Sequence, residues 1–265
     1  MKITDKTAEK VRSVVPYRLY IFLQEMYKTN KLLKKVKHGS AALKMKKYKG
    51  YKPAGWMGDK MQIYIDYVKH GTNINVKNIF EIGANFAQDA DYLMELFNLD
   101  PKDVYVFEAH PEIYNAIKKI HKFNTFNNAV FNERKKIKFN IFPLNHVDTG
   151  WASIYGKDGE EIEVQAIRMD DFMEENHIEK IDFLKIDVEG ATYPVLEGFG
   201  SRLKDVNCIQ LEAEHGKYAI IPYEKISTLL LENDFELVHF HRANHLGLSD
   251  SFWVKKEMIV CNVEN

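Results

Sequence analysis

Short apolar runs alternate with segments of helical periodicity along most of this chain. Ile79-Phe80 opens one run, a helical pattern covers residues 87–97, and a second run, residues 104–107, ends at Glu108. This order of strand, tight turn, helix and strand predicts a parallel βαβ unit with a right-handed crossover. A further run, residues 181–187, is apolar enough to be buried on both faces, as strands of a parallel sheet are. The pattern therefore predicts an α/β fold.

The same periodicities place the remaining elements. Pro111 and Pro222 favour helix starts, because the φ angle of proline is already helical. We expect helices over residues 59–69, 112–120, 171–176, 191–199 and 223–233, and strands over residues 124–130, 136–142, 161–168, 206–211, 235–240 and 252–260. Residues 241–251 then form the loop between the last two strands.

The turn after the first run points to a ligand. Gly83 can sit where the backbone passes close to a bound molecule, and Glu108, at the end of the next strand, suits a ribose diol. The turn, Gly83-Ala84-Asn85-Phe86-Ala87-Gln88, lacks two of the three glycines of a dinucleotide fingerprint, which disfavours NAD. S-adenosylmethionine (SAM) has no phosphate and demands less of the loop. The turn alone leaves open a SAM site or a structural βαβ unit without a cofactor.

Four segments carry a family resemblance: EIGAN, VFEAHP, MDDF and FLKIDVEGATYPVLEGF. In order and spacing they resemble the FkbM family of SAM-dependent methyltransferases, from about Asn78 to the C-terminus. The resemblance implies a class I methyltransferase fold, a Rossmann-like and mostly parallel sheet with an antiparallel last strand. It also implies methylation of hydroxyl groups on sugars or other natural products. One departure is Ala87, where the family usually has a second glycine.

The resemblance assigns a set of positions to the cofactor. A segment like residues 128–130 lies beside the adenine in the family, although an ordinary strand end would explain it equally well. The expected SAM-binding residues are Glu81, Gly83, Ala84, Asn85, Phe86, Glu108, Ala109, Asn128, Ala129 and Asp187.

Acidic residues and one histidine follow the fourth and fifth core strands, where open α/β sheets bind ligands. Asp187 could orient the methionine ammonium, bind a metal or accept a proton, and His215 titrates near neutral pH and would suit a general base. Glu212 is a further catalytic candidate; we expect at most one of Glu212 and Glu214 to face the pocket. Asp187, Glu212 and His215 could hold Mg²⁺ or Mn²⁺, but their spacing does not demand a metal, and none is expected.

The segment 144–157 is too polar and glycine-containing to be core, and long irregular loops are often functional. We interpret it as part of the acceptor pocket; a plain surface loop is the alternative. Aromatic residues there could stack on a sugar ring, and histidines could hydrogen-bond its hydroxyl groups. The expected acceptor-binding residues are His146, Trp151, Ser153, Tyr155, Glu189, Glu214 and His241.

Charge is unevenly distributed along the chain. Residues 1–60 hold sixteen of the 37 basic and four of the 38 acidic residues, which leaves 21 basic and 34 acidic residues in the rest. We therefore expect a basic helical extension and linker, residues 1–58, before a methyltransferase domain, residues 59–265. The extension could be a helical cap, a homodimer contact or a surface for anionic membranes or acidic glycans. No nucleic acid is expected, because the acidic domain would repel a phosphate backbone.

The remaining features bear on location and on other enzyme classes. Cys208 and Cys261 fall in a predicted strand and directly after one, without a CxxC motif, which fits a reducing cytosol. No signal peptide or run of 18 apolar residues is visible, so we expect a cytoplasmic protein, free or at the inner face of the membrane. No nucleophile elbow or P-loop supports a hydrolase or a nucleoside triphosphatase.

The sequence thus predicts a SAM-dependent O-methyltransferase that acts on a sugar hydroxyl, in a surface glycan or its nucleotide-sugar precursor. Two alternatives remain: a methyltransferase of a small secondary metabolite with an oxygen or nitrogen acceptor, and a catalytically inactive scaffold. Only Ala87 favours the scaffold, whereas Glu108 and Asp187 favour an enzyme.

Overall fold

The computed structural model describes residues 61–143, 152–156, 159–215, 219–243 and 247–260. The basic extension lies outside these residues. Among the described helices, none is long and apolar enough to cross a membrane.

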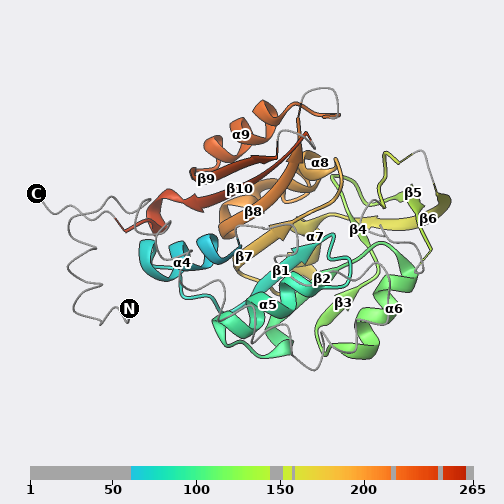
Figure 1. Cartoon of the computed structure of the whole chain (residues 1–265), viewed down its shortest axis with the longest axis horizontal. Coiled ribbons are helices and arrows are strands. Elements are labelled where there is room, and N and C mark those ends of the chain that lie inside the picture. The colour runs from blue at the N-terminus through green and yellow to red at the C-terminus, as the bar shows by residue number, and fades with distance from the viewer. Residues whose placement is uncertain (1–60, 144–151, 157–158, 216–218, 244–246, 261–265) are drawn as a thin grey trace, which may run out of the picture.

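A seven-stranded sheet forms the centre of the molecule, in the order β3-β2-β1-β7-β8-β10-β9 (Figure 1). Its strands are β1 (Ile79–Ile82), β2 (Val104–Phe107), β3 (Asn124–Phe126), β7 (Ile181–Ile186), β8 (Val206–Glu214), β9 (Phe235–Ala243) and β10 (Leu248–Lys255). Strands β3, β2, β1, β7 and β8 are parallel, and β10 is antiparallel to both β8 and β9. This confirms the mostly parallel sheet with an antiparallel last strand. All six residues of β7 are buried, as its central position requires.

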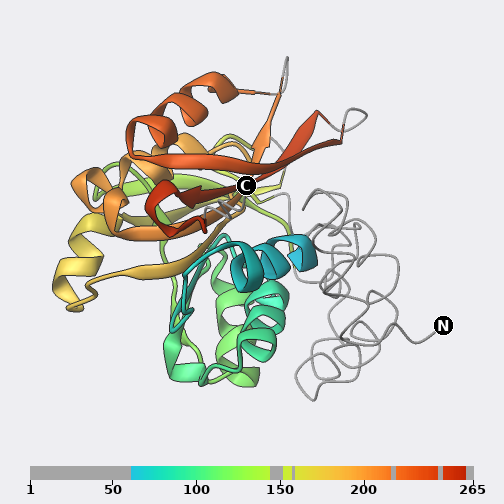
Figure 2. The ribbon, with the colours of Figure 1, turned by 90° about the vertical axis from the view of Figure 1, so that its left-hand side faces the viewer.

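Helices cover both faces of this sheet. Helices α4 (Met61–Gly71), α5 (Gln88–Phe97) and α6 (Pro111–Ile120) lie on one face, and α7 (Met169–Glu175), α8 (Thr192–Glu197) and α9 (Tyr223–Glu232) on the other. In Figure 2, the blue and green helices lie below the sheet and the orange α9 above it. Short 3₁₀ helices span Pro101–Asp103, Gly200–Asp205 and Lys256–Met258.

The alternating residues of each strand separate the two halves of the core. Phe183 and Phe252 pack with Ile65 of α4 on one face, whereas Leu184 and Trp253 pack with the helices of the other. Fully burying a side chain of this size contributes roughly 1.5–3 kcal/mol. The two buried layers therefore fix the strand register, because a slip of one residue would exchange the faces.

A second, three-stranded sheet lies next to the parallel strands of the first sheet. It has the order β4-β6-β5, with β4 (Ala129–Val130), β5 (Lys136–Ile141) and β6 (Glu160–Ile167). Strand β4 is parallel to β6, and β5 is antiparallel to it. Ala109, Phe139 and Ala166 form part of a small core of its own. This sheet becomes one wall of the functional site.

Two predicted elements differ from the observed ones. The strand expected over residues 124–130 is divided between the two sheets, because Asn127 leaves the ladder and its amide donates to the carbonyl oxygens of Glu108 and Ala109. The last strand spans Leu248–Lys255 rather than residues 252–260, and the 3₁₀ helix Lys256–Met258 follows it. His241 lies on β9 opposite Asp250 and not in a loop. Because Ser249 and Asp250 are polar, the sequence pattern does not indicate the first part of this strand, although these residues continue its pairing.

Candidate active site

The turn between β1 and α5 has an unusual backbone. Gly83, Asn85 and Ala87 have φ angles of 77°, 46° and 54°. A Cβ added to Gly83 would lie 1.8 Å from the carbonyl oxygen of Asp187, so only glycine fits here. The close approach expected at Gly83 thus exists, but its neighbour is the chain leaving β7.

Glu108 follows β2 and holds this turn in place. Its Oε2 accepts a hydrogen bond from the Asn85 N–H at 2.7 Å, and its Oε1 accepts one from the His110 N–H at 2.7 Å. The residue is 6% exposed, and burial raises the pKa of Glu108 to about 7, although these two hydrogen bonds oppose the rise. Each oxygen keeps a second lone pair, so the carboxylate can still bind a pair of hydroxyl groups.

A pocket lies at the carboxyl ends of β1, β2 and β7, and its empty space of about 600 Å³ includes open solvent at its mouth. The second sheet and the 152–154 segment close its far side. Seven of the ten expected cofactor residues line it: Gly83, Asn85, Glu108, Ala109, Asn128, Ala129 and Asp187.

The other three expected cofactor residues do not line the pocket. Ala84 and Phe86 are at most 1% exposed and pack beneath the turn in the core around α5 and α6. Glu81 accepts a hydrogen bond from the Ala90 N–H and lies 3.5 Å from the Lys185 ammonium. These residues support the turn rather than face the pocket.

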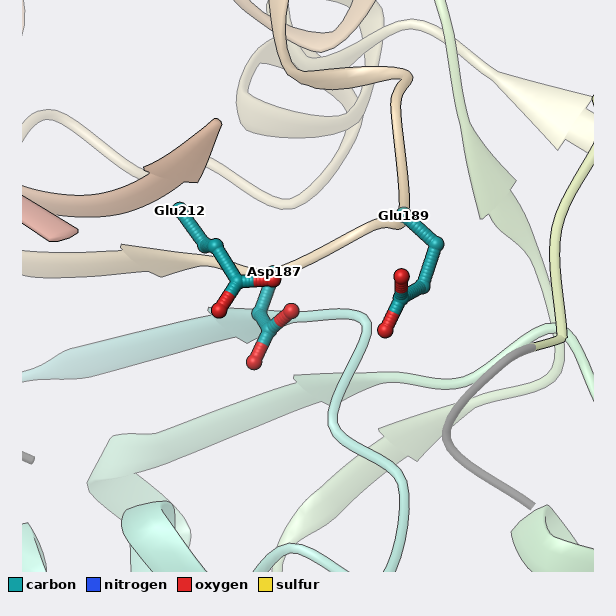
Figure 3. A group of neighbouring side chains, drawn as sticks. All are labelled: Asp187, Glu189 and Glu212. Carbon is teal, nitrogen blue, oxygen red and sulfur yellow. The ribbon is translucent and has the colours of Figure 1, made fainter. Parts of the chain in front are cut away.

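Three carboxylates converge beside the pocket (Figure 3). Asp187 follows β7, Glu189 stands in the next loop, and Glu212 extends from β8, with carboxylate oxygens within 4.8 Å of one another. Burial, together with Asp187 and Glu214, raises the pKa of Glu189 to about 8. Burial, followed by Asp187 and Glu189, also raises the pKa of Glu212 well above its ordinary value. Oxygen ligands at this spacing could hold a divalent cation.

Glu214 lies on the same side of β8 as Glu212. The pKa of Glu214 is raised by burial and by the charge of Asp187, and its Oε1 lies 3.7 Å from the position of a Cβ at Gly190. Neither glutamate lines the pocket, although the alternation along the strand that was expected to separate them does not do so. Side chains two residues apart on a strand point to the same face.

A short loop reaches over Glu189. Ser153 is 6% exposed, and its hydroxyl donates to the Glu189 carbonyl oxygen at 2.7 Å while accepting from the Tyr155 N–H at 3.1 Å. Glu189 has a φ of 46°, which costs energy for a residue with a side chain. A Cβ at Gly190 would lie 3.3 Å from the ring of Tyr155. Ser153 and Tyr155 therefore border the acidic group, Ser153 through the backbone.

The two predicted histidines that the structure describes, His215 and His241, do not join this group. The Nε2 atom of His215 lies 2.6 Å from the Ser249 hydroxyl, and its ring contacts Tyr223 and Phe240. His215 is absent from the cluster of possible metal ligands among the described residues, and it does not line the pocket. Burial lowers its pKa. His241 is exposed on β9, and His146 and Trp151 lie outside the described residues.

Sequence reasoning missed most of the apolar lining and one ion network. Strand-end positions were the only signal for Ile82, Phe107 and Val188; the other apolar lining residues are Ile113, Val130, Phe131, Phe139, Ala152, Ile154 and Ala191. The network surrounds Lys185, which lies 3.1 Å from Asp89 and 3.2 Å from Asp187. Its signal was a lysine inside an otherwise apolar buried strand.

Comparisons with known proteins bear on the family. Residues 81–237, more than half of the chain, match the model of the methyltransferase FkbM domain. No curated protein matches the chain.

Solved structures also align with the chain. An FkbM methyltransferase from Methylobacillus flagellatus KT aligns with a TM-score of 0.48 and 8% identity, over 74% of this chain and 55% of that one. The chain thus spans about half the length of that relative. A protein of the NADB-Rossmann superfamily from Streptococcus agalactiae aligns with a TM-score of 0.43 and 14% identity, over 76% of this chain and 70% of that one. A putative tRNA (m1A22) methyltransferase from Streptococcus pneumoniae, in complex with SAM, aligns with a TM-score of 0.42 and 13% identity. This alignment covers 77% of this chain and 75% of that one.

The family match spans β1, β2, β7 and β8, and with them the turn, Glu108 and the acidic group. The chain belongs to the FkbM methyltransferase family.

Proposed function

We propose that this protein transfers a methyl group from SAM to a hydroxyl of a sugar, in a surface glycan or its nucleotide-sugar precursor. The observation that carries the cofactor assignment is Glu108. Its carboxylate is preset by two backbone N–H groups and lines the pocket beside Gly83 and Asn85. A carboxylate at this strand end fits the two hydroxyls of a ribose, and no phosphate cradle is needed for SAM.

The rest of the pocket fits the remaining parts of SAM. Apolar side chains such as Ile113 and Phe139 offer an adenine ring a surface to pack on. Asp187 borders the same pocket and can pair with the methionine ammonium. When bound, SAM supplies an electrophilic methyl group on a sulfonium.

The acceptor belongs on the side of Glu189 and Glu212. A hydroxyl must lose its proton during transfer, and a carboxylate with a pKa near neutrality suits a general base. Glu189 lines the pocket, and its pKa of about 8 matches this task. Tyr155 lies close enough to Gly190 to offer a ring on which a sugar could stack.

A second candidate is an amine acceptor in a small metabolite. The observation that favours it is the convergence of Asp187, Glu189 and Glu212, which would attract a cationic substrate. The proposed base would then take a proton from an ammonium.

Calorimetry with SAM and its demethylated product tests the cofactor, and absence of binding by either would contradict the proposal. Transfer of a labelled methyl group to saccharides, compared with amines of similar size, then decides between the acceptors. Running the reaction in excess EDTA, with Mg²⁺ or Mn²⁺ added back, decides whether the acidic group works with a metal. Full activity in EDTA would rule out a metal mechanism.

For the basic extension we propose contact with the protein's own acidic domain or with a second copy, the 44–49 lysine cluster lying near the pocket mouth. Its charge excess, sixteen basic against four acidic residues in residues 1–60, supports an acidic partner. If the extension joins two copies, deletion of residues 1–50 should change the oligomeric state on a sizing column. If the lysine cluster steers the acceptor, reversal of Lys46, Lys47 and Lys49 to Glu should raise the acceptor KM, less so in high salt. Binding to anionic liposomes with neither change would favour a peripheral membrane role.

A further inference from the structure

Lys185 is a charged residue in β7, a strand in which every residue is buried. It is 4% exposed and does not line the pocket, so it cannot touch a substrate there. An unpaired ammonium in such a place would be very costly. Its presence therefore calls for partners that offset the burial.

Those partners come from three different elements. The ammonium nitrogen lies 3.5 Å from Glu81 Oε1 on β1, 3.1 Å from Asp89 Oδ2 in the first turn of α5, and 3.2 Å from Asp187 Oδ2 after β7. The side chains of Glu81 and Asp89 are 1% and 13% exposed, whereas that of Asp187 is 36% exposed. Asp187 is therefore the partner through which Lys185 can act on the pocket.

Glu81 and Asp89 stand on either side of the cofactor turn. Glu81 also accepts the Ala90 N–H at 3.1 Å, so Lys185 and Glu81 together fix both ends of the segment that carries Gly83, Asn85 and Ala87. Positive φ angles at non-glycine residues cost energy and persist only where the surroundings hold them. One lysine thus restrains the turn and the carboxylate that meet at the pocket.

We infer that Lys185 is a positioning residue for SAM, which orients the Asp187 carboxylate and holds the 83–87 turn in its binding conformation. The inference rests on the proposed cofactor. Burial lowers the pKa of Lys185, but Asp187, Asp89 and Glu81 raise it by more, so it lies well above its ordinary value and the ammonium stays charged. No proton transfer is needed for this role.

Positioning and simple charge balance predict opposite changes. If Lys185 only offset negative charge, its removal would leave a more negative pocket, and a cationic cofactor would bind as tightly or more tightly. If it positions Asp187 and the turn, its removal should weaken SAM binding. The sign of the change in affinity therefore distinguishes the two roles.

The test compares Lys185→Met with the double variant Lys185→Met/Asp89→Asn, and Lys180→Met is the matched control. Lys180 is exposed just before β7, so its loss changes the net charge equally. We expect the single variant to melt at a lower temperature, because buried carboxylates lose their cation, and the double variant to recover part of that loss. In both variants the SAM dissociation constant should rise at least tenfold by calorimetry, with no change in the control.

Affinity equal to or tighter than wild type in the stability-rescued double variant would overturn the inference. A wild-type protein that fails to bind SAM would instead contradict the proposed function. Should the variants not fold, the wild-type ammonium resonance of Lys185 can be followed by nitrogen NMR. Addition of SAM should shift it, because Asp187 gains a second cationic partner, and an unmoved resonance would overturn the inference.

Discussion

Residues at positive φ lie in both of the loops that border the pocket. Asn85 and Ala87 lie in the turn after β1, and Glu189 lies in the loop after β7. A left-handed conformation costs an L-residue roughly 1–2 kcal/mol, so the surrounding contacts must hold it. The Glu108 carboxylate and the Ser153 hydroxyl supply two of these contacts, by hydrogen bonds to Asn85 N and Glu189 O.

Ala87 shows how a single methyl group can be tolerated in such a position. It is fully buried, with a φ of 54°. Ala87→Gly relieves a left-handed residue but removes a buried methyl worth about 0.8 kcal/mol and adds freedom to the unfolded chain. We therefore expect a change in unfolding free energy within about 1 kcal/mol. Ala87→Val, β-branched and overpacked, should cost more than about 2 kcal/mol. Urea unfolding measures both, and a large loss in the glycine variant would contradict this account.

Glu108 gives the most direct test of the cofactor site. Hydrogen bonds to a carboxylate contribute roughly 1.5–3 kcal/mol, so Glu108→Ala should weaken SAM binding at least tenfold by calorimetry. Part of the effect will pass through Asn85, whose N–H loses its acceptor. Glu112→Ala is the matched control, because Glu112 is exposed in the first turn of α6. Equal SAM affinity in the two variants would show that the ribose does not bind at Glu108.

At the scale of elements, the 152–156 loop is tied to the chain after β7 by one side chain. Ser153→Ala removes the hydroxyl that joins the loop to the Glu189 carbonyl, at a cost of about 1 kcal/mol. We expect the acceptor KM to rise several-fold while SAM affinity changes little, since Ser153 does not line the pocket. Ser153→Thr, which keeps the hydroxyl, should retain more activity. An equal loss in both variants would point to packing rather than the hydrogen bond.

The elements that the sequence predicts well are those with strong periodicity. The helix expected over residues 59–69 is present as α4, which buries Met61, Ile65 and Val68, and β7 is buried throughout as its apolar run indicates. The ends of β10 and the division between β3 and β4 were not predictable in this way. Their bounds depend on partner strands and on Asn127, whose hydrogen bonds are long-range.

In the candidate site, too, the residues placed by a local pattern are predicted, and those placed by distant contacts are not. Glu108 and Asp187 reach the pocket as expected, because the carboxyl ends of parallel strands meet at one edge. The direction of the His215 side chain follows from the alternation of side chains along a strand. Because His215 comes directly after Glu214, it points to the opposite face, where Tyr223 packs. The apolar lining from β5, such as Phe139, comes from a second sheet whose position no local pattern predicted.

At the scale of the whole molecule, the buried carboxyl groups link folding to pH. Burial raises the pKa of Glu81 and of Glu189 to about 8, and that of Glu108 to about 7. In the unfolded chain these groups titrate at about 4.3. Between these limits the folded state binds more protons than the unfolded state, so stability must fall as the pH rises. Burial lowers the pKa of His110 and His215, which opposes this trend only below the ordinary histidine value of about 6.5.

The carboxyl groups therefore determine the change in stability without the histidines between pH 6.5 and about 8.5. The ordinary histidine pKa sets the lower end of this window, and the raised carboxyl pKa values set the upper end. Without ligand, the melting temperature should fall by several degrees across it, since each kcal/mol moves the midpoint by roughly 2–4 °C in a domain of about 200 residues. Glu189→Gln should flatten the dependence, because it removes one group that the folded state must ionise at a cost. Glu112→Gln, at an exposed position, should leave it unchanged. A melting temperature that stays constant across this window would show that the carboxyl groups are already ionised in the folded protein, with Lys185 or a bound cation offsetting their charge.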